Sequence, residues 1–228
     1  MKPESTRDQV QVVLADSMIL RDGGREQAAY AALEAGLKRF PDNNDLLYDY
    51  AMMAEKRNNL ASMETSLRKI IAQAPNSQQA YNALGYALAD RNLRLAEAFA
   101  LIDTALKLAP DDPFIMDSMG WVQFRMGNLK QAEQQLRRAY ALRPDAEIAV
   151  HLGEVLWAEG QKNRCPATVA RSTQQRPEKN DALKKHTGTP ECAVVSLDSR
   201  LASTASKKYT RPSIFLNPNK SLRRMPFF

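Results

Sequence analysis

Residues 110–144 read PDDPFIMDSMGWVQFRMGNLKQAEQQLRRAYALRP, and the plan of this stretch decides the fold. Asp111 or Asp112 can cap a first helix, and the turn MGN at 126–128 ends it. A second helix follows, and Pro144 ends that one. In both helices the apolar residues recur at spacings of three and four, so each helix buries one face. The stretch is therefore predicted to be a helix–turn–helix unit.

The same plan recurs along the chain with a period near 34 residues. Prolines that follow an apolar helix stand 33 to 35 residues apart, at Pro41, Pro75, Pro110, Pro144 and Pro177. Seventeen residues before each proline stand residues mostly suited to a tight turn: Gly24, Asn58, Leu93, Gly127 and Gly160. The positions 12 and five residues before each proline are mostly small. Self-similarity at a fixed period predicts a stack of repeated helix pairs.

The repeats are placed near 9–42, 43–76, 77–111 and 112–145. The first helix of a fifth repeat follows, so the array is expected to cover residues 1–160. Between Ala89 and Ala98 the third repeat holds one residue more than the fourth. We expect this extra residue to lie in the turn between the two helices.

A glycine recurs inside the first helix of three repeats, at Gly85, Gly120 and Gly153. Glycine in a helix interior costs roughly 1 kcal/mol relative to alanine. We expect each glycine to face a small residue of the second helix, so that the two backbones approach closely. That repeated contact would offset the cost.

This pattern resembles the tetratricopeptide repeat (TPR) family. The family's first-helix order appears as Tyr81, Leu84-Gly85, Leu88 and as Met116, Met119-Gly120, Phe124. Its second-helix positions appear as Ala98, Ile102, Ala105 and as Ala132, Leu136, Ala139. The first two repeats depart from it, with Ser17 and Ala51 in place of the glycine and Asp16 in place of the leucine. The resemblance implies an all-α fold, specifically a right-handed α-solenoid. The chain is similar to the C-terminal array of long Gram-negative bacterial TPR proteins.

The resemblance also implies a function. First helices of such an array line its concave side, and the chain is expected to be a non-enzymatic scaffold or adaptor that binds proteins or peptides there without a cofactor. The predicted groove residues are Tyr48, Met52, Asn82, Tyr86, Asp117, Trp121, Arg125, Glu154 and Trp157. In an alternative interpretation, some of the aromatic residues among them only pack between neighbouring repeats.

The sequence offers little for other chemistries. It contains no nucleophile motif or phosphate loop, so an enzyme is not expected. His151 and Glu154 stand three apart on one helix, but two ligands do not make a metal site. We interpret them as a surface histidine beside a surface glutamate. Cys165 and Cys192 are expected to be free thiols.

The C-terminal part has a different composition. Residues 161–228 carry 14 Lys/Arg against 4 Asp/Glu, a balance of +10, which leaves −4 for residues 1–160. Residues 161–185 have the spacing of a second helix, but Pro166 breaks it. Residues 186–228 are predicted to be disordered. Residues 174–185, QQRPEKNDALKK, look like repeat sequence while the residues on both sides do not, a pattern that shifts of reading frame would produce.

The basic tail suggests an alternative function. The segments KKYTR and SLRRMPFF, at 207–211 and 221–228, interleave bases with aromatic residues, and such segments can bind nucleic acid or an anionic membrane. We do not expect nucleic acid to be the main partner. No run approaches the ~20 apolar residues of a membrane span. The start MKPESTRDQV lacks the apolar region of a signal peptide, so the chain is expected to be cytoplasmic, or at the periplasmic face of the envelope if it is a fragment of a longer lipoprotein.

Overall fold

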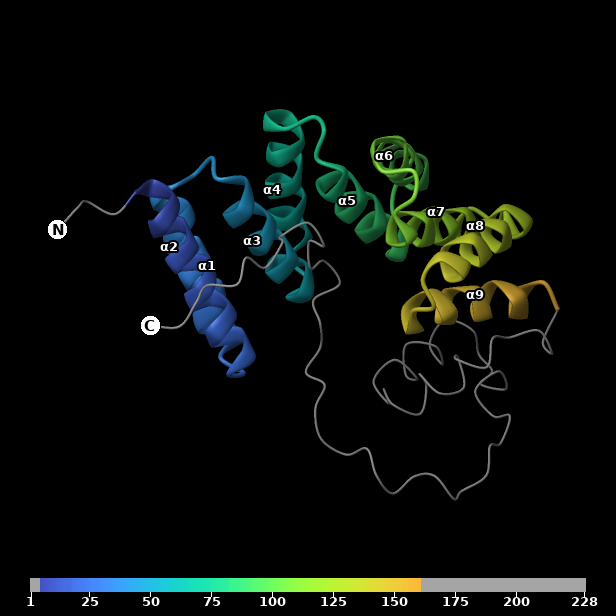
Figure 1. Cartoon of the computed structure of the whole chain (residues 1–228), viewed down its shortest axis with the longest axis horizontal. Coiled ribbons are helices and arrows are strands. Elements are labelled where there is room, and N and C mark those ends of the chain that lie inside the picture. The colour runs from blue at the N-terminus through green and yellow to red at the C-terminus, as the bar shows by residue number, and fades with distance from the viewer. Residues whose placement is uncertain (1–4, 161–228) are drawn as a thin grey trace, which may run out of the picture. The chain divides into compact units, whose positions relative to one another are not determined.

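The structure, a computed structural model, describes residues 5–160, and within them it contains nine α-helices and no strand (Figure 1). Short turns separate the helices, each of which is 13 to 17 residues long. Their bounds are α1 (Thr6–Asp22), α2 (Glu26–Arg39), α3 (Asn44–Lys56), α4 (Leu60–Gln73), α5 (Gln78–Asp90), α6 (Leu95–Leu108), α7 (Pro113–Arg125), α8 (Leu129–Leu142) and α9 (Ala146–Ala158).

The helices pack in chain order. α1 packs on α2, α3 on α4, α5 on α6 and α7 on α8, and each second helix also contacts the first helix of the next pair. First helices contact one another as well, α5 with α7 and α7 with α9. This succession of nearest-neighbour contacts is an α-solenoid, as the repeat pattern predicts.

Local sequence explains where the helices begin. Ser5 and Asp8 form a capping box at the start of α1, in which each side chain accepts a hydrogen bond from the other residue's backbone N–H. At α7, the Asp112 side chain accepts hydrogen bonds from the N–H groups of Phe114 and Ile115. Pro113 then occupies the first helical position, where its missing N–H costs nothing.

The turns inside the helix pairs use left-handed backbone. The φ angle is 73° at Gly24, 59° at Asn58 and 84° at Gly127, and it is 78° at Gly160, which follows α9. A positive φ is easiest for glycine and tolerable for asparagine, which explains the residues that recur at this position. Leu93, which occupies the equivalent position in the third repeat, does not have a positive φ.

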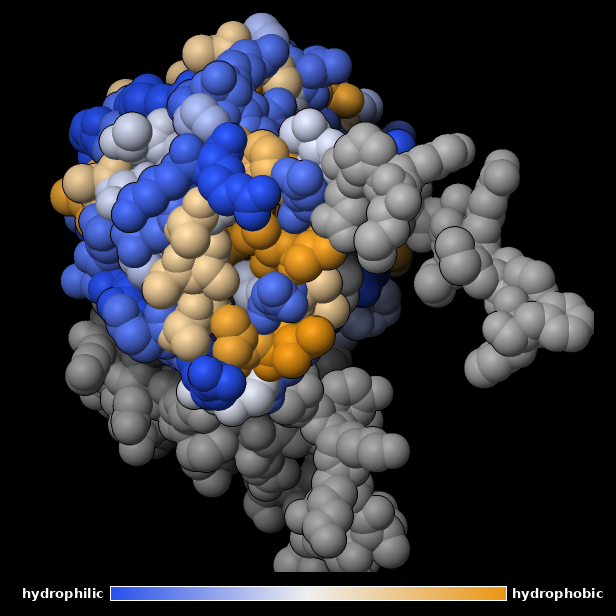
Figure 2. Space-filling view, turned by 90° about the vertical axis from the view of Figure 1, so that its left-hand side faces the viewer, coloured by the Kyte–Doolittle hydropathy of each residue, from blue (hydrophilic) through white to orange (hydrophobic). Residues whose placement is uncertain are grey.

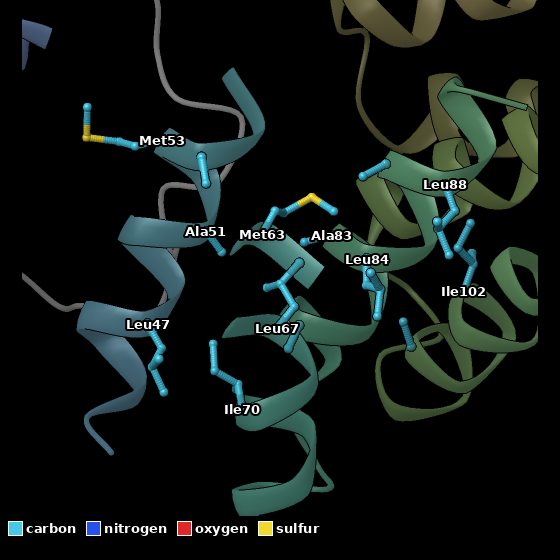
Figure 3. Packing of buried hydrophobic residues seen from close by; sticks show 14 of the residues in the cluster. Leu47, Ala51, Met53, Met63, Leu67, Ile70, Ala83, Leu84, Leu88 and Ile102 are labelled. Atoms are coloured by element: carbon cyan, nitrogen blue, oxygen red, sulfur yellow. The ribbon is translucent and has the colours of Figure 1, made fainter. Parts of the chain in front are cut away.

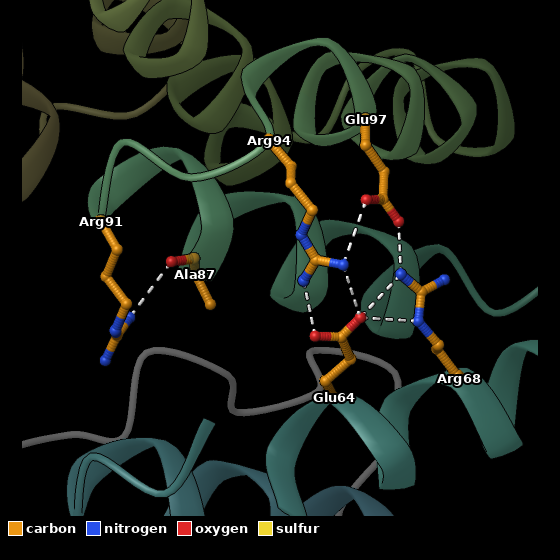
Figure 4. A network of polar contacts seen from close by, with 6 residues as sticks. All are labelled: Glu64, Arg68, Ala87, Arg91, Arg94 and Glu97. Atoms are coloured by element: carbon orange, nitrogen blue, oxygen red, sulfur yellow. Dashed lines mark hydrogen bonds and ion pairs between the residues drawn. The ribbon is translucent and has the colours of Figure 1, made fainter. Parts of the chain in front are cut away.

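The extra residue of the third repeat lies in the turn between α5 and α6, as predicted. Asn92 and Arg94 take the left-handed conformation there, with φ of 56° and 44°. Arg94 is held by Glu64 of α4, whose two carboxylate oxygens accept hydrogen bonds of 3.0 and 2.6 Å from its guanidinium group. Arg68 and Glu97 complete this network between α4 and α6 (Figure 4). The longer turn is thus fastened to the preceding repeat.

Gly85 and Gly120 are points of close contact, and the prediction of a small partner on the second helix is confirmed only at Gly85, which approaches the backbone of Ala98 as well as the side chain of Ile102. A Cβ atom on Gly120 would lie 2.5 Å from Leu136 Cγ, and one on Gly85 would lie 2.6 Å from Ile102 Cγ1. The missing side chain therefore admits a large aliphatic residue of the second helix. At Gly85 the backbone also matters, because the carbonyl oxygen of Ala98 would be only 2.9 Å from the added atom.

The buried core of the described helices forms two clusters, and the half-buried Leu106 and Phe124 pack against both of them. In the middle of the array, Met63, Leu67 and Ile70 of α4 lie between the neighbouring first helices, and Ile102 of α6 meets Leu88 of α5 (Figure 3). The small residues that the repeat predicts in the second helices are fully buried, at 0% exposure for Ala29, Ala98 and Ala132. Each repeat thus shares its apolar surface with its neighbours.

Candidate functional site

The nine predicted groove residues all lie on first helices, from α3 to α9. Three of them are buried: Asn82 is 2% exposed, and Asp117 and Trp121 are each 5% exposed. The other six are half-buried and keep part of their surface in contact with solvent: Tyr48, Met52, Tyr86, Arg125, Glu154 and Trp157. Their role as groove residues stays a prediction.

A buried pair of ionisable side chains joins α7 to α9. Nδ1 of His151 lies 2.9 Å from both carboxylate oxygens of Asp117, and both side chains are less than 10% exposed. The His151 ring stacks on Trp121, with centroids 4.3 Å apart and planes 22° apart. The ring of Tyr86, on the first helix α5, has its centroid 6.1 Å from that of the His151 ring. The interpretation of His151 as a surface residue is therefore wrong.

Sequence reasoning missed this pair because it considered His151 only with its own helix. Asp117 and His151 are 34 residues apart, one repeat period. Adjacent first helices pack side by side, so residues about one period apart face each other. Glu55 and Arg91 form a second such pair, 36 residues apart, with a distance of 2.7 Å. Opposite charges one period apart are thus the signal that could have found both contacts.

Asp117 and His151 both have raised pKa values, but for different reasons. Burial lowers the pKa of His151, but the carboxylate of Asp117 outweighs it and raises the pKa to about 9. Glu147 and Glu154 on α9 act in the same direction. Burial raises the pKa of Asp117 above its usual value, against the lowering effect of His151. The proton is therefore held firmly between the two side chains at neutral pH.

Two buried polar atoms on the neighbouring first helices α5 and α7 have no hydrogen-bond partner within the part of the chain that the structure describes. They are Nε1 of Trp121, a donor, and Oδ1 of Asn82, an acceptor. The Trp121 ring is covered by Phe124 at 5.3 Å and by the guanidinium group of Arg125 at 5.7 Å. A buried polar group without a partner typically costs 1–3 kcal/mol. Two neighbouring repeats therefore each hold one polar atom whose hydrogen bond is not made.

The structure bears on only some of the other sequence predictions. Within residues 5–160, no three His, Cys, Asp or Glu side chains come together as metal ligands would, and no helix is both long and apolar enough to span a membrane. Predictions about Cys165, Cys192, Pro166 and the basic tail, including the proposed units 161–185 and 186–228, fall outside the described residues.

Sequence comparison gives the family. Residues 17–62, 64–113 and 118–162 each match the tetratricopeptide repeat model. The chain belongs to the TPR family. The matched stretches run from the last part of α1 to α9 almost without interruption, in keeping with the helix pairs of the structure.

One relative is the TPR repeat-containing protein PA4667 of Pseudomonas aeruginosa, which is 49% identical over 145 residues. The match covers 64% of this chain but only 25% of that protein. The fold of this TPR chain is also similar to the crystal structure of TTC0263, a TPR protein of Thermus thermophilus, with a TM-score of 0.64, 24% identity and coverage of 77% and 96% of the two chains. The pilus biogenesis factor PilW gives a TM-score of 0.64 at 22% identity, covering 81% and 88%.

Proposed function

We propose that this TPR protein is a non-enzymatic scaffold that binds a peptide segment of another protein along its first helices. Family membership supports protein–protein interaction in general. The binding face that we propose is built from the half-buried residues Tyr48, Met52 and Tyr86 and from the neighbouring pair Asn82 and Trp121.

One observation carries the choice of this face. Asn82 Oδ1 is a hydrogen-bond acceptor and Trp121 Nε1 is a donor, and neither has a partner among the described residues. They come from neighbouring first helices, α5 and α7, which pack against each other. Both atoms are enclosed by neighbouring side chains, so a peptide reaches them only when those side chains move aside. Its backbone, which offers one donor and one acceptor per residue, can then satisfy both atoms. Tyr86, on the same side of α5, supplies an aromatic surface of the kind that dominates binding energies.

The pair of Asp117 and His151 limits what this face can bind. Because each is the other's partner, neither is available to contact a ligand directly. Their role is instead to hold Trp121 in place, since His151 stacks on its ring. Recognition is therefore expected to depend on aromatic contact and backbone hydrogen bonds more than on a charge in the peptide.

Selection from a peptide library displayed on phage tests the proposal. The full 228-residue chain serves as bait, and calorimetry then measures the affinity of the selected peptides. Trp121→Phe keeps the aromatic stacking and removes the donor, and we expect it to weaken binding about tenfold, the loss of one hydrogen bond to a buried group. Tyr86→Leu is expected to weaken binding at least as much.

The matched control is Leu142→Ala, which alters an exposed residue of the second helix α8. It should bind with wild-type affinity. If the selected peptides bind all variants equally, or if no peptide is selected, the proposed face is wrong. If binding collapses between low and physiological salt, electrostatic binding through the basic segment becomes the better explanation.

A further inference from the structure

The outer side of α1 carries an apolar stripe that its own repeat leaves uncovered. Val12 is 53% exposed and Ile19, two turns further along, is 66% exposed. Large exposed aliphatic residues are normal when they stand singly. These two lie on the same face of one helix, because a separation of seven residues is close to two helical turns. Figure 2, which faces the α1 and α2 end of the molecule, shows apolar residues grouped together with hydrophilic residues around them.

The same two repeat positions are buried in every later first helix. In the place of Val12, Leu46, Ala80, Ile115 and Ile148 are at most 3% exposed. In the place of Ile19, Met53, Ala87, Val122 and Val155 are at most 5% exposed. The α1 stripe thus has the composition of a buried surface, and its exposure is a property of its position in the array.

Contacts of the equivalent residues show what covers these positions elsewhere. Leu46 of α3 lies against Gly36 of α2, where a Cβ atom would be 3.5 Å from Leu46 Cδ1. Met53 of α3 reaches α1, with its sulfur 3.8 Å from Ser17 Oγ. Both helices of the preceding pair therefore contact this face of α3. The corresponding face of α1 has the apolar residues for the same contact.

We infer that the exposed face of α1 is a docking surface for a further helix pair of the TPR type, stacked on α1 as α1 and α2 stack on α3. The occupant presents the end face of a repeat, with small and aliphatic side chains opposite Val12 and Ile19. This inference does not depend on the proposed peptide-binding face. It also agrees with a relative in which the matched region is only a quarter of the protein.

Asp16 argues against a symmetric dimer at this face. It is exposed between Val12 and Ile19, in the repeat position that Leu84, Met119 and Leu152 fill elsewhere. A two-fold axis through the middle of the stripe would bring two Asp16 carboxylates together, and like charges that face each other are destabilising. A helix pair of a different sequence does not have this conflict.

An extended chain tests the inference. A copy of residues 43–76, the second helix pair, is placed directly before residues 9–228, which keeps the repeat spacing. We expect the thermal midpoint to rise by about 5 °C relative to the natural chain, because an interface between repeats is added. Hydrogen exchange should show protection of the added helices.

Two substitutions in α1 test whether the added helices pack on the exposed face of α1 or only lengthen the chain. Ile19→Glu should abolish the rise in the extended chain and leave the midpoint of the natural chain unchanged. Asp16→Leu should raise the midpoint of the extended chain further, because it supplies the leucine that α5 has at this repeat position, the buried Leu84, and should not affect the natural chain. Leu142→Glu, at an exposed site on α8, is the control. It should not alter the difference in thermal midpoint between the extended and the natural chain.

Three outcomes would overturn the inference. The added helices could exchange freely, with no rise in the midpoint. Ile19→Glu could instead destabilise the natural chain, which would mean that a segment within residues 161–228 already covers the face. Finally, ultracentrifugation could show a dimer of the natural chain that Ile19→Glu dissolves, in which case a second copy is the occupant.

Discussion

α1 and α7 are built on the same repeat plan and have opposite surroundings. In α7 every residue from Ile115 to Val122 is buried, because helices of the repeats on both sides pack against it. In α1 only Val10 and Ser17 are buried. The comparison shows that the burial of a residue in this array is decided by the neighbouring repeats at least as much as by its own helix.

The two helices also treat a carboxylate differently. Asp16 lies on the exposed side of α1, where water solvates it. Asp117 lies within the buried run of α7, where a charge is costly unless it is paired, and His151 supplies the partner from the next repeat. A polar residue inside the array is therefore tolerated only with a matching residue about one period away.

Breaking that match gives the largest expected effect. His151→Ala leaves the buried Asp117 without a partner, and we expect a loss of about 4 kcal/mol in the free energy of unfolding. Urea denaturation followed by circular dichroism measures it. Replacing both residues, with Asp117→Asn and His151→Gln, should recover part of the loss. A single variant as stable as the wild type would show that the pair is not structural.

The contrast between α1 and α7 is sharpened by one substitution made at two isoleucines. Ile115→Ala removes a side chain that is 3% exposed, and it should cost about 3 kcal/mol, as large-to-small changes in cores do. Ile19→Ala, at a residue that is 66% exposed, should stay within about 0.5 kcal/mol of the wild type. Equal losses in urea denaturation would mean that α1 is covered in solution.

The pH dependence of stability is expected to be no larger than the loss caused by Ile115→Ala. The pKa of His151 is raised from 6.5 to about 9 in the folded chain, so its contribution is complete below pH 6.5 and is lost as the pH rises through 9. We expect a decrease of up to about 3 kcal/mol in the free energy of unfolding over that range. The double variant with Asp117→Asn and His151→Gln should lack this decrease. An identical decrease in both proteins would assign the titration to other groups.

The sequence was sufficient to predict the fold because the repeat is encoded locally. Turn residues, prolines and apolar spacing recur in each unit, and each of them acts within one helix pair. Even the extra residue of the third repeat could be placed in its turn. The large side chains that fill the space beside two helix glycines, Ile102 at Gly85 and Leu136 at Gly120, were missed, because the repeat spacing does not show which side chain of the second helix extends into the gap.

The site was predictable only in outline. The periodicity places Asn82, Asp117 and Trp121 on first helices, but their exposure depends on side chains from the next repeat. Trp121, for example, is enclosed partly by His151, which stands on another helix 30 residues away. Aligning the repeats and looking for opposite charges one period apart would have found the Asp117–His151 pair. The unpartnered atoms of Asn82 and Trp121 could not have been found without coordinates.

The longer turn between α5 and α6 shows where this chain can accept new sequence. One additional residue is accommodated there without disturbing the pairing of the two helices, and Asn92 and Leu93 project from the surface. The anchoring of Arg94 by Glu64 fixes the far end of the turn. A reporter group, an affinity label or a short foreign epitope inserted after Asn92 would therefore be displayed on a rigid base.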